Sequence, residues 1–130
     1  MIIPQTDTPG AAATDTHGFI DDQLANCRSP EEAAQFVTNL KRFSELVIQE
    51  FGADFADLPA AEKQAAMSAF ALNESPFTAL PGDFFYQLKA LTIVGYYSSQ
   101  AGASQELVYL PVPGGYLGSF KVSDLSLIHI

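Results

Sequence analysis

The chain has few basic residues, a single cysteine and no tryptophan. Its 130 residues include six Lys and Arg against fifteen Asp and Glu, which gives a formal net charge of −9. Nucleic acids and anionic membrane surfaces attract proteins through Lys and Arg, so we expect neither as a partner. One cysteine cannot form an internal disulfide. No apolar run approaches the roughly 20 residues that span a bilayer, so we expect no transmembrane segment.

The sequence also lacks the motifs that build most active sites. It contains no G-x-G-x-x-G, P-loop or C-x-x-C-H run, and therefore no cradle for a dinucleotide, a phosphate or a haem. A metal site needs several ligands, and His17 and His129 are the only histidines. The pairs Asp21-Asp22 and Glu31-Glu32 are neighbours that diverge on a helix, so they form no carboxylate dyad. We expect no catalytic, cofactor-binding or metal-binding residue in this chain.

The spacing of apolar residues predicts a mainly α fold: a small bundle of about four helices, then a short extended arm rich in Pro and Gly. We expect one domain over residues 1–121, because 130 residues is near the commonest domain size. The first helix should begin near Thr14 to Thr16, where either hydroxyl could cap it. Phe19 or Ile20, together with Leu24 and Cys27, falls on one face of it, which predicts a core position for the cysteine.

The second helix has the clearest start signal. Ser29 with Glu32 three residues later predicts a capping box, and Gly52 predicts the end of the helix. A long apolar stripe should face the core, made of Ala33, Phe36, Val37, Leu40, Phe43, Val47 and Phe51. A third helix is expected from about Pro59 to Asn73, with Ala66, Ala69 and Phe70 on its inner face.

The stretch from residue 84 to residue 118 is the part around which the rest is organised. It predicts a helix that Asp83 caps and that Gly102 ends in the left-handed conformation. One face carries Phe84, Leu88, Leu91 and Gly95, and the opposite side is apolar as well, with Tyr86, Ala90, Ile93, Val94 and Tyr97. A helix that is apolar all round is covered on more than one side. We therefore expect either a central helix of the domain or a helix that lies against a partner protein.

The arm that follows the helix is the expected partner-binding segment. Leu107 to Leu110 is a short β-prone run, and Pro111 and Pro113 hold the chain extended. Tyrosine is enriched at protein interfaces because its ring is apolar and its hydroxyl can hydrogen-bond. The interface candidates are Tyr96, Tyr97, Tyr109, Pro111, Pro113 and Tyr116. For Tyr96, packing within the core is the alternative. At the other end, residues 3–13 read as a loop, either ordered on the surface or a solvent-exposed lead-in.

Three motifs resemble one known family. Leu88 to Gly102 (L-K-A-L-T-I-V-G-Y-Y-S-S-Q-A-G) and Leu107 to Gly118 (L-V-Y-L-P-V-P-G-G-Y-L-G) resemble the C-terminal signature of the gluconate 2-dehydrogenase subunit 3 family. Ile2 to Ala11 (I-I-P-Q-T-D-T-P-G-A) resembles its opening motif. The resemblance implies a small, non-catalytic subunit of a membrane-associated, periplasmic, flavin-dependent sugar or sugar-acid dehydrogenase. It also implies a large flavoprotein partner that carries FAD, and a cytochrome partner that carries haem c.

The family role implied is to bind the flavoprotein, to support its folding and to supply a twin-arginine export signal. Such a leader is absent from this sequence, so we expect a partial chain. The family's acidic-Gly-Cys step is also missing, since Leu117, Gly118 and Ser119 stand there. Residues 122–130 form an atypical tail that we do not expect to be native. The alternative function is a free-standing helical module that binds proteins or an apolar ligand.

Overall fold

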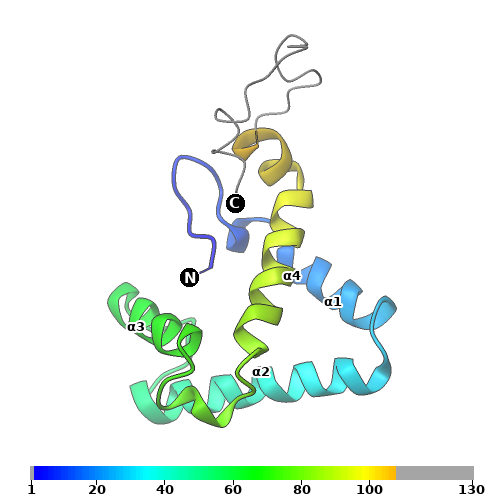
Figure 1. Ribbon diagram of the computed structural model, residues 1–130. Coiled ribbons are helices and arrows are strands. Elements are labelled where there is room, and N and C mark those ends of the chain that lie inside the picture. Colours follow the sequence, from blue (N-terminus) through cyan, green and yellow to red (C-terminus); the bar gives the residue numbers. More distant parts are fainter. Residues whose placement is uncertain (1, 108–130) are drawn as a thin grey trace, which may run out of the picture.

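Four α-helices and three short helical turns make up the part of the chain that the structure describes. The computed structural model describes residues 2–107, and Figure 1 shows their arrangement. The α-helices are α1 (Thr16–Asn26), α2 (Pro30–Phe51), α3 (Ala60–Ala71) and α4 (Phe84–Ser98), and the turns are η1 (Ala11–Ala13), η2 (Phe77–Ala79) and η3 (Gly102–Glu106). No strand occurs in this range. The mainly α prediction is confirmed, while the arm from Val108 onward and the boundary at residue 121 lie outside the described residues.

The longest helix, α2, begins and ends where the sequence predicts. The Ser29 hydroxyl accepts a hydrogen bond from the backbone N–H of Glu32 at 3.2 Å, and the Ser29 N–H donates to the Glu32 carboxylate at 3.0 Å. These two hydrogen bonds satisfy two backbone donors that would otherwise lack partners. At the other end, Gly52 adopts φ 78°, the left-handed conformation that glycine takes at low cost. The capping box and the terminating glycine are both confirmed.

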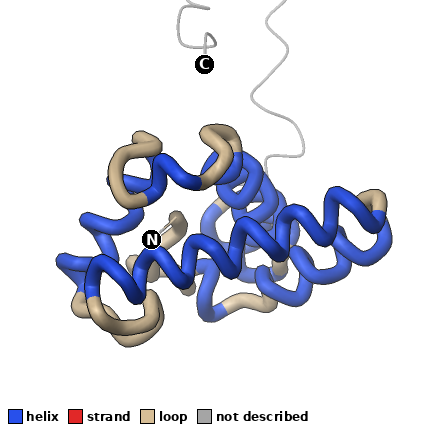
Figure 2. The backbone as a smooth tube through the Cα atoms, turned by 90° about the horizontal axis from the view of Figure 1, so that it is seen from below, coloured by secondary structure: helices blue, strands red, loops and turns tan. Residues whose placement is uncertain are grey.

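A cluster of phenylalanines joins α2, α3, η2 and the first turn of α4. The Phe43 ring lies 4.8 Å from the Phe70 ring and 5.2 Å from the Phe77 ring, measured between centroids. The Phe36 ring meets the Phe84 ring edge-on at 5.2 Å. All five side chains are buried. Figure 2 shows the longest helix, α2, running across the domain. The buried cluster takes Phe36, Phe43, Leu46 and Val47 from this helix.

The predicted stripe on α2 is too wide. Val37 is 41% exposed and Leu40 is 42% exposed, whereas Leu46, which the stripe omits, is 5% exposed. Val37 lies about 100° around the helix from Phe36 and therefore points away from the core. Leu40 is on the inner side, but it borders an open hollow, which leaves part of it in solvent. On α3 the inner face is as predicted, with Ala66 and Phe70 buried and Ala69 partly buried.

The core position predicted for Cys27 is wrong. α1 ends at Asn26, and Cys27 follows as its cap, with an exposed side chain. Its φ of −118° is not helical, so the side chain leaves the face that the periodicity assigned to it. The predicted hydroxyl cap of α1 is also absent. Asp15 occupies the cap position without a side-chain bond, while the hydroxyls of Thr14 and Thr16 pair with each other at 2.8 Å.

The two ends of α4 differ from the sequence prediction. Asp83 occupies the cap position, but its carboxylate accepts a hydrogen bond from the Gln87 side chain at 2.7 Å instead of capping the backbone. The helix ends at Ser98, and Gly102 opens the π-helical turn η3 without adopting a left-handed conformation. A Cβ at Gly102 would lie 2.1 Å from the Tyr96 carbonyl oxygen. Glycine is needed there because the chain folds closely back onto α4.

Candidate partner interface

The N-terminal loop is a closed, docked element. The Ala11 N–H donates to the Ile3 carbonyl at 3.2 Å, which brings the two ends of the loop together. Gly10 is buried at the closure, where a Cβ would lie 2.6 Å from the Gln5 nitrogen. The Thr8 hydroxyl donates to the Glu106 carboxylate and so ties the loop to η3. Of the two alternatives for residues 3–13, the structure shows the ordered surface element.

Tyr96 fastens this loop to the central helix. Its side chain is 1% exposed, and its hydroxyl donates to the Pro9 carbonyl at 2.7 Å. A buried tyrosine hydroxyl normally finds such a partner. Of the two readings for Tyr96, its placement corresponds to packing within the chain. Tyr97 meets the Tyr96 ring edge-on at 5.1 Å and is half-buried. Tyr109, Pro111, Pro113 and Tyr116 lie outside the described residues, so their interface role stays a prediction.

A glycine lets α1 lie close to α4. Gly95 is buried, and a Cβ there would lie 2.7 Å from the Phe19 ring and 3.2 Å from the Thr16 methyl group. Small residues at helix contacts allow such close approach. The inner side of α4, with Phe84, Leu88, Leu91 and Gly95, is thus covered as the sequence predicts.

Within residues 2–107, no segment covers the outer side of α4. We call its crest the α4 ridge and define it by Tyr86, Ala90, Ile93 and Val94. Tyr86 is 62% exposed, Ile93 36% and Val94 55%, and Ala90 is exposed as well. The spacing places Tyr86, Ala90 and Ile93 above one another, and Val94, about 100° around the helix from Ile93, stands at the edge of the same side. Lys89 is the single charged residue between Phe84 and Ser98, and it lies to one side of the ridge. The sequence pattern showed these positions to be apolar but not that they would remain open.

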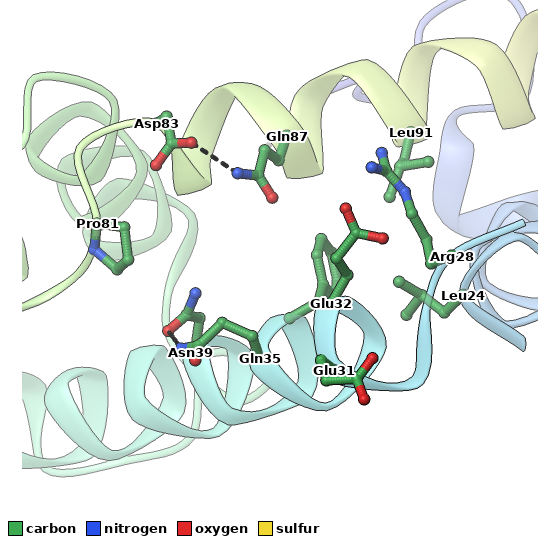
Figure 3. A pocket seen from close by; sticks show the side chains of 11 residues that line it. Leu24, Arg28, Glu31, Glu32, Gln35, Asn39, Pro81, Asp83, Gln87 and Leu91 are labelled. Atoms are coloured by element: carbon green, nitrogen blue, oxygen red, sulfur yellow. Dashed lines mark hydrogen bonds between the residues drawn. The ribbon is translucent and has the colours of Figure 1, made fainter.

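Two hollows flank the ridge. The larger, of about 630 Å³, lies between α4, the first half of α2 and the end of α1 (Figure 3). Its charged lining consists of Glu31, Glu32 and Asp83 against a single Arg28, which makes it acidic. Hydrogen bonds from the backbone and side chain of Ser29, with a smaller effect of Arg28, hold the pKa of Glu32 below its ordinary value. The smaller hollow, of about 220 Å³, includes Lys89 in its lining.

A third hollow is apolar. It has about 280 Å³ and lies where the N-terminal loop crosses α2, α3 and α4. Its lining is Ile2, Ile3, Ala11, Ala12, Leu40, Phe43, Phe55, Met67, Leu88 and Thr92. The Thr92 hydroxyl is already bonded to the Leu88 carbonyl at 2.8 Å. The hollow therefore offers mainly apolar contacts, and the hydrogen of its one side-chain hydroxyl is already donated.

The remaining chemical groups are dispersed. His17 is exposed at the start of α1, and its ring contacts the Asp15 carboxylate at 3.3 Å. Within residues 2–107, no three His, Cys, Asp or Glu side chains come together as metal ligands. His129 is beyond the described range. In the same range, no helix combines the length and the apolar character needed to cross a bilayer.

Comparison with known proteins identifies the family. The sequence model of the family described as "Gluconate 2-dehydrogenase subunit 3" matches residues 1–114. No curated protein and no solved structure matches the chain significantly. The matched region takes in the N-terminal loop, all four α-helices and the residues that dock the loop on α4. Because the match covers most of the 130 residues, the chain belongs to the gluconate 2-dehydrogenase subunit 3 family.

Proposed function

We propose that this chain is the non-catalytic accessory subunit of a flavin-dependent dehydrogenase complex that oxidises a sugar or sugar acid in the periplasm. The observation that carries the proposal is the family match over residues 1–114. FAD belongs to the large partner subunit and haem c to a cytochrome partner, while this chain binds neither. Its part is to hold the flavoprotein, support its folding and accompany its export.

The open face of α4 supports a role in assembly. Apolar surface in contact with water is unfavourable, and another apolar surface that covers this strip would lower the free energy. In the described region this strip runs along the helix that organises the fold. The N-terminal loop, held by Tyr96, is a second ordered surface feature next to the same helix. Both features suit a subunit that presents a preformed surface to a larger protein.

Co-expression tests the proposal directly. The full chain, carrying an affinity tag, is produced together with the large FAD-binding dehydrogenase subunit from the same organism and is then purified through the tag. We expect the eluate to contain both proteins, to show flavin absorbance and to oxidise sugars with an artificial electron acceptor. The tagged chain produced alone should be colourless and inactive, and the untagged flavoprotein should not bind the resin. An eluate without the flavoprotein would refute the proposal.

A second candidate is a free-standing helical module that holds an apolar small molecule. The apolar hollow of about 280 Å³ under the N-terminal loop favours it. On this hypothesis a linear aliphatic alcohol such as decanol should raise the melting temperature of the isolated chain, and Leu40→Gln should abolish the rise. If decanol leaves the melting temperature unchanged, the hollow is not a ligand site.

A further inference from the structure

The α4 ridge differs from the exposed apolar residues of α2. On α2, Val37, Leu40 and Ile48 are exposed, but Lys41, Arg42 and Glu45 stand among them. The ridge instead spreads its four apolar side chains over about two helical turns, and the exposed Gln87 and Lys89 lie beside it. Interface cores are depleted of charged residues and enriched in aromatic ones, and Tyr86 supplies an aromatic side chain here. By composition, the ridge resembles the centre of an interface.

The flanks of the ridge indicate what kind of surface would cover it. On one side, Glu31, Glu32 and Asp83 face the larger hollow with Arg28 as their single basic neighbour. Opposite charges across an interface fix its register and speed the encounter of the two proteins. A matching partner therefore combines an apolar groove, which receives the ridge, with Lys or Arg side chains along the edge that reaches this hollow.

We propose that the large flavoprotein subunit docks on the α4 ridge, with an apolar groove over Tyr86, Ala90, Ile93 and Val94 and basic side chains toward the acidic hollow. The inference rests on the proposed function, since it takes the partner from there and adds the surface. A second copy of the chain fits less well. Each copy carries a net charge of −9, so two copies repel each other, and near the ridge of one copy the acidic hollow of the other would find only Lys89 and Arg28 as basic side chains among the described residues.

The test uses two valines that match in chemistry and differ only in place. Val94, on the ridge, is 55% exposed, and Val37, on the far side of α2, is 41% exposed. Each is replaced by lysine in the full tagged chain, which is co-expressed with the large flavoprotein subunit. Because both side chains are in solvent, both variants should melt close to the wild-type temperature, as circular dichroism would verify. We expect Val94→Lys to lower the affinity for the flavoprotein roughly tenfold to thirtyfold, the size of an interface hot spot, and Val37→Lys to leave it within about twofold.

A second pair of measurements tests the electrostatic part. Wild-type association should slow as ionic strength rises, because salt screens attraction between charged surfaces. The double substitution Glu31→Gln and Asp83→Asn should slow association at low salt and flatten this dependence. Equal salt dependence in the wild type and the double variant would show that basic side chains of the partner do not reach the hollow, and would overturn that half of the inference.

The possible failures are distinguishable. If the wild-type chain captures the flavoprotein and Val94→Lys captures it equally well, the docking surface is wrong and the proposed function stands. If the wild-type chain captures no flavoprotein, both fall together. Sedimentation of the isolated chain separates the remaining case. A stable dimer that Val94→Lys dissociates would assign the ridge to a second copy and overturn the inference.

Discussion

Removal of one hydroxyl group should weaken the attachment of the N-terminal loop to the domain. In Tyr96→Phe the ring keeps its buried packing, but the hydrogen bond to the Pro9 carbonyl, 2.7 Å long, is lost. A typical intramolecular hydrogen bond contributes about 1 kcal/mol, and a carbonyl left without a partner adds to the cost where water cannot reach it. Because Pro9 belongs to a surface loop, water can replace the lost donor, so we expect a cost near 1 kcal/mol.

Amide hydrogen exchange can show which part of the domain loses stability in this variant. The amides of Ala11 and Ala13 are bonded to the Ile3 and Gly10 carbonyls within the loop, and they should exchange about fivefold faster in Tyr96→Phe, the factor that corresponds to 1 kcal/mol. Amides in the middle of α2 should change less, because they open with the whole domain.

Tyr86→Phe is the matched control for this loss. Its hydroxyl belongs to a side chain that is 62% exposed, so neither urea stability nor exchange should change. Unchanged exchange at Ala11 and Ala13 in Tyr96→Phe would show that the loop stays docked without the tyrosine, and would refute the reasoning.

The other predictions concern the helix faces, the capping box and Gly95. Phe36→Ala should cost roughly 3–5 kcal/mol in urea unfolding, while Leu40→Ala should cost well under half as much because its side chain is 42% exposed. Ser29→Ala should cost about 1 kcal/mol. The pKa of Glu32 is lowered in the folded state, so its carboxylate contributes to stability above the ordinary carboxyl pKa. This contribution is lost as the pH falls through the folded pKa. The destabilisation caused by Glu32→Gln should therefore vanish in melts at acid pH. Gly95→Ala should destabilise the domain although alanine has the better helix propensity, because the new methyl group would clash with Phe19. A higher melting temperature of this variant would contradict the prediction.

The sequence was most informative where one residue type has one local role. Ser29 and Glu32 act within the first turn of α2 and Gly52 at its last turn, and all three have the roles that the pattern indicates. Gly102 shows the limit of such reasoning. Its position after a helix suggested the left-handed conformation, but the need for glycine comes from contact with the Tyr96 carbonyl. A close approach between two segments leaves no signal in the spacing of residues.

The burial of individual side chains was also hard to predict from the sequence. Cys27 continues the apolar spacing of α1, yet the helix stops one residue earlier and the side chain turns to solvent. Leu46 is buried although the predicted stripe omits it. Which side of α2 is covered depends on other segments of the chain, whose positions the sequence does not show. For the same reason the sequence could show that α4 is apolar all round, but not which of its faces residues 2–107 leave open.

The two halves of α4 are fixed by different means, and this bears on how the ridge can act. The first turn is held by the phenylalanine cluster, through Phe84 against Phe36 and Phe70. The last turns are held by close contact at Gly95 and by the Tyr96 hydrogen bond to the N-terminal loop. The ridge lies between these anchors and on the opposite side of the helix, so covering it disturbs neither. A surface that is already rigid loses little conformational freedom on association. A partner that docks there therefore needs no rearrangement of the domain, and the free and bound forms of α4 should have the same backbone.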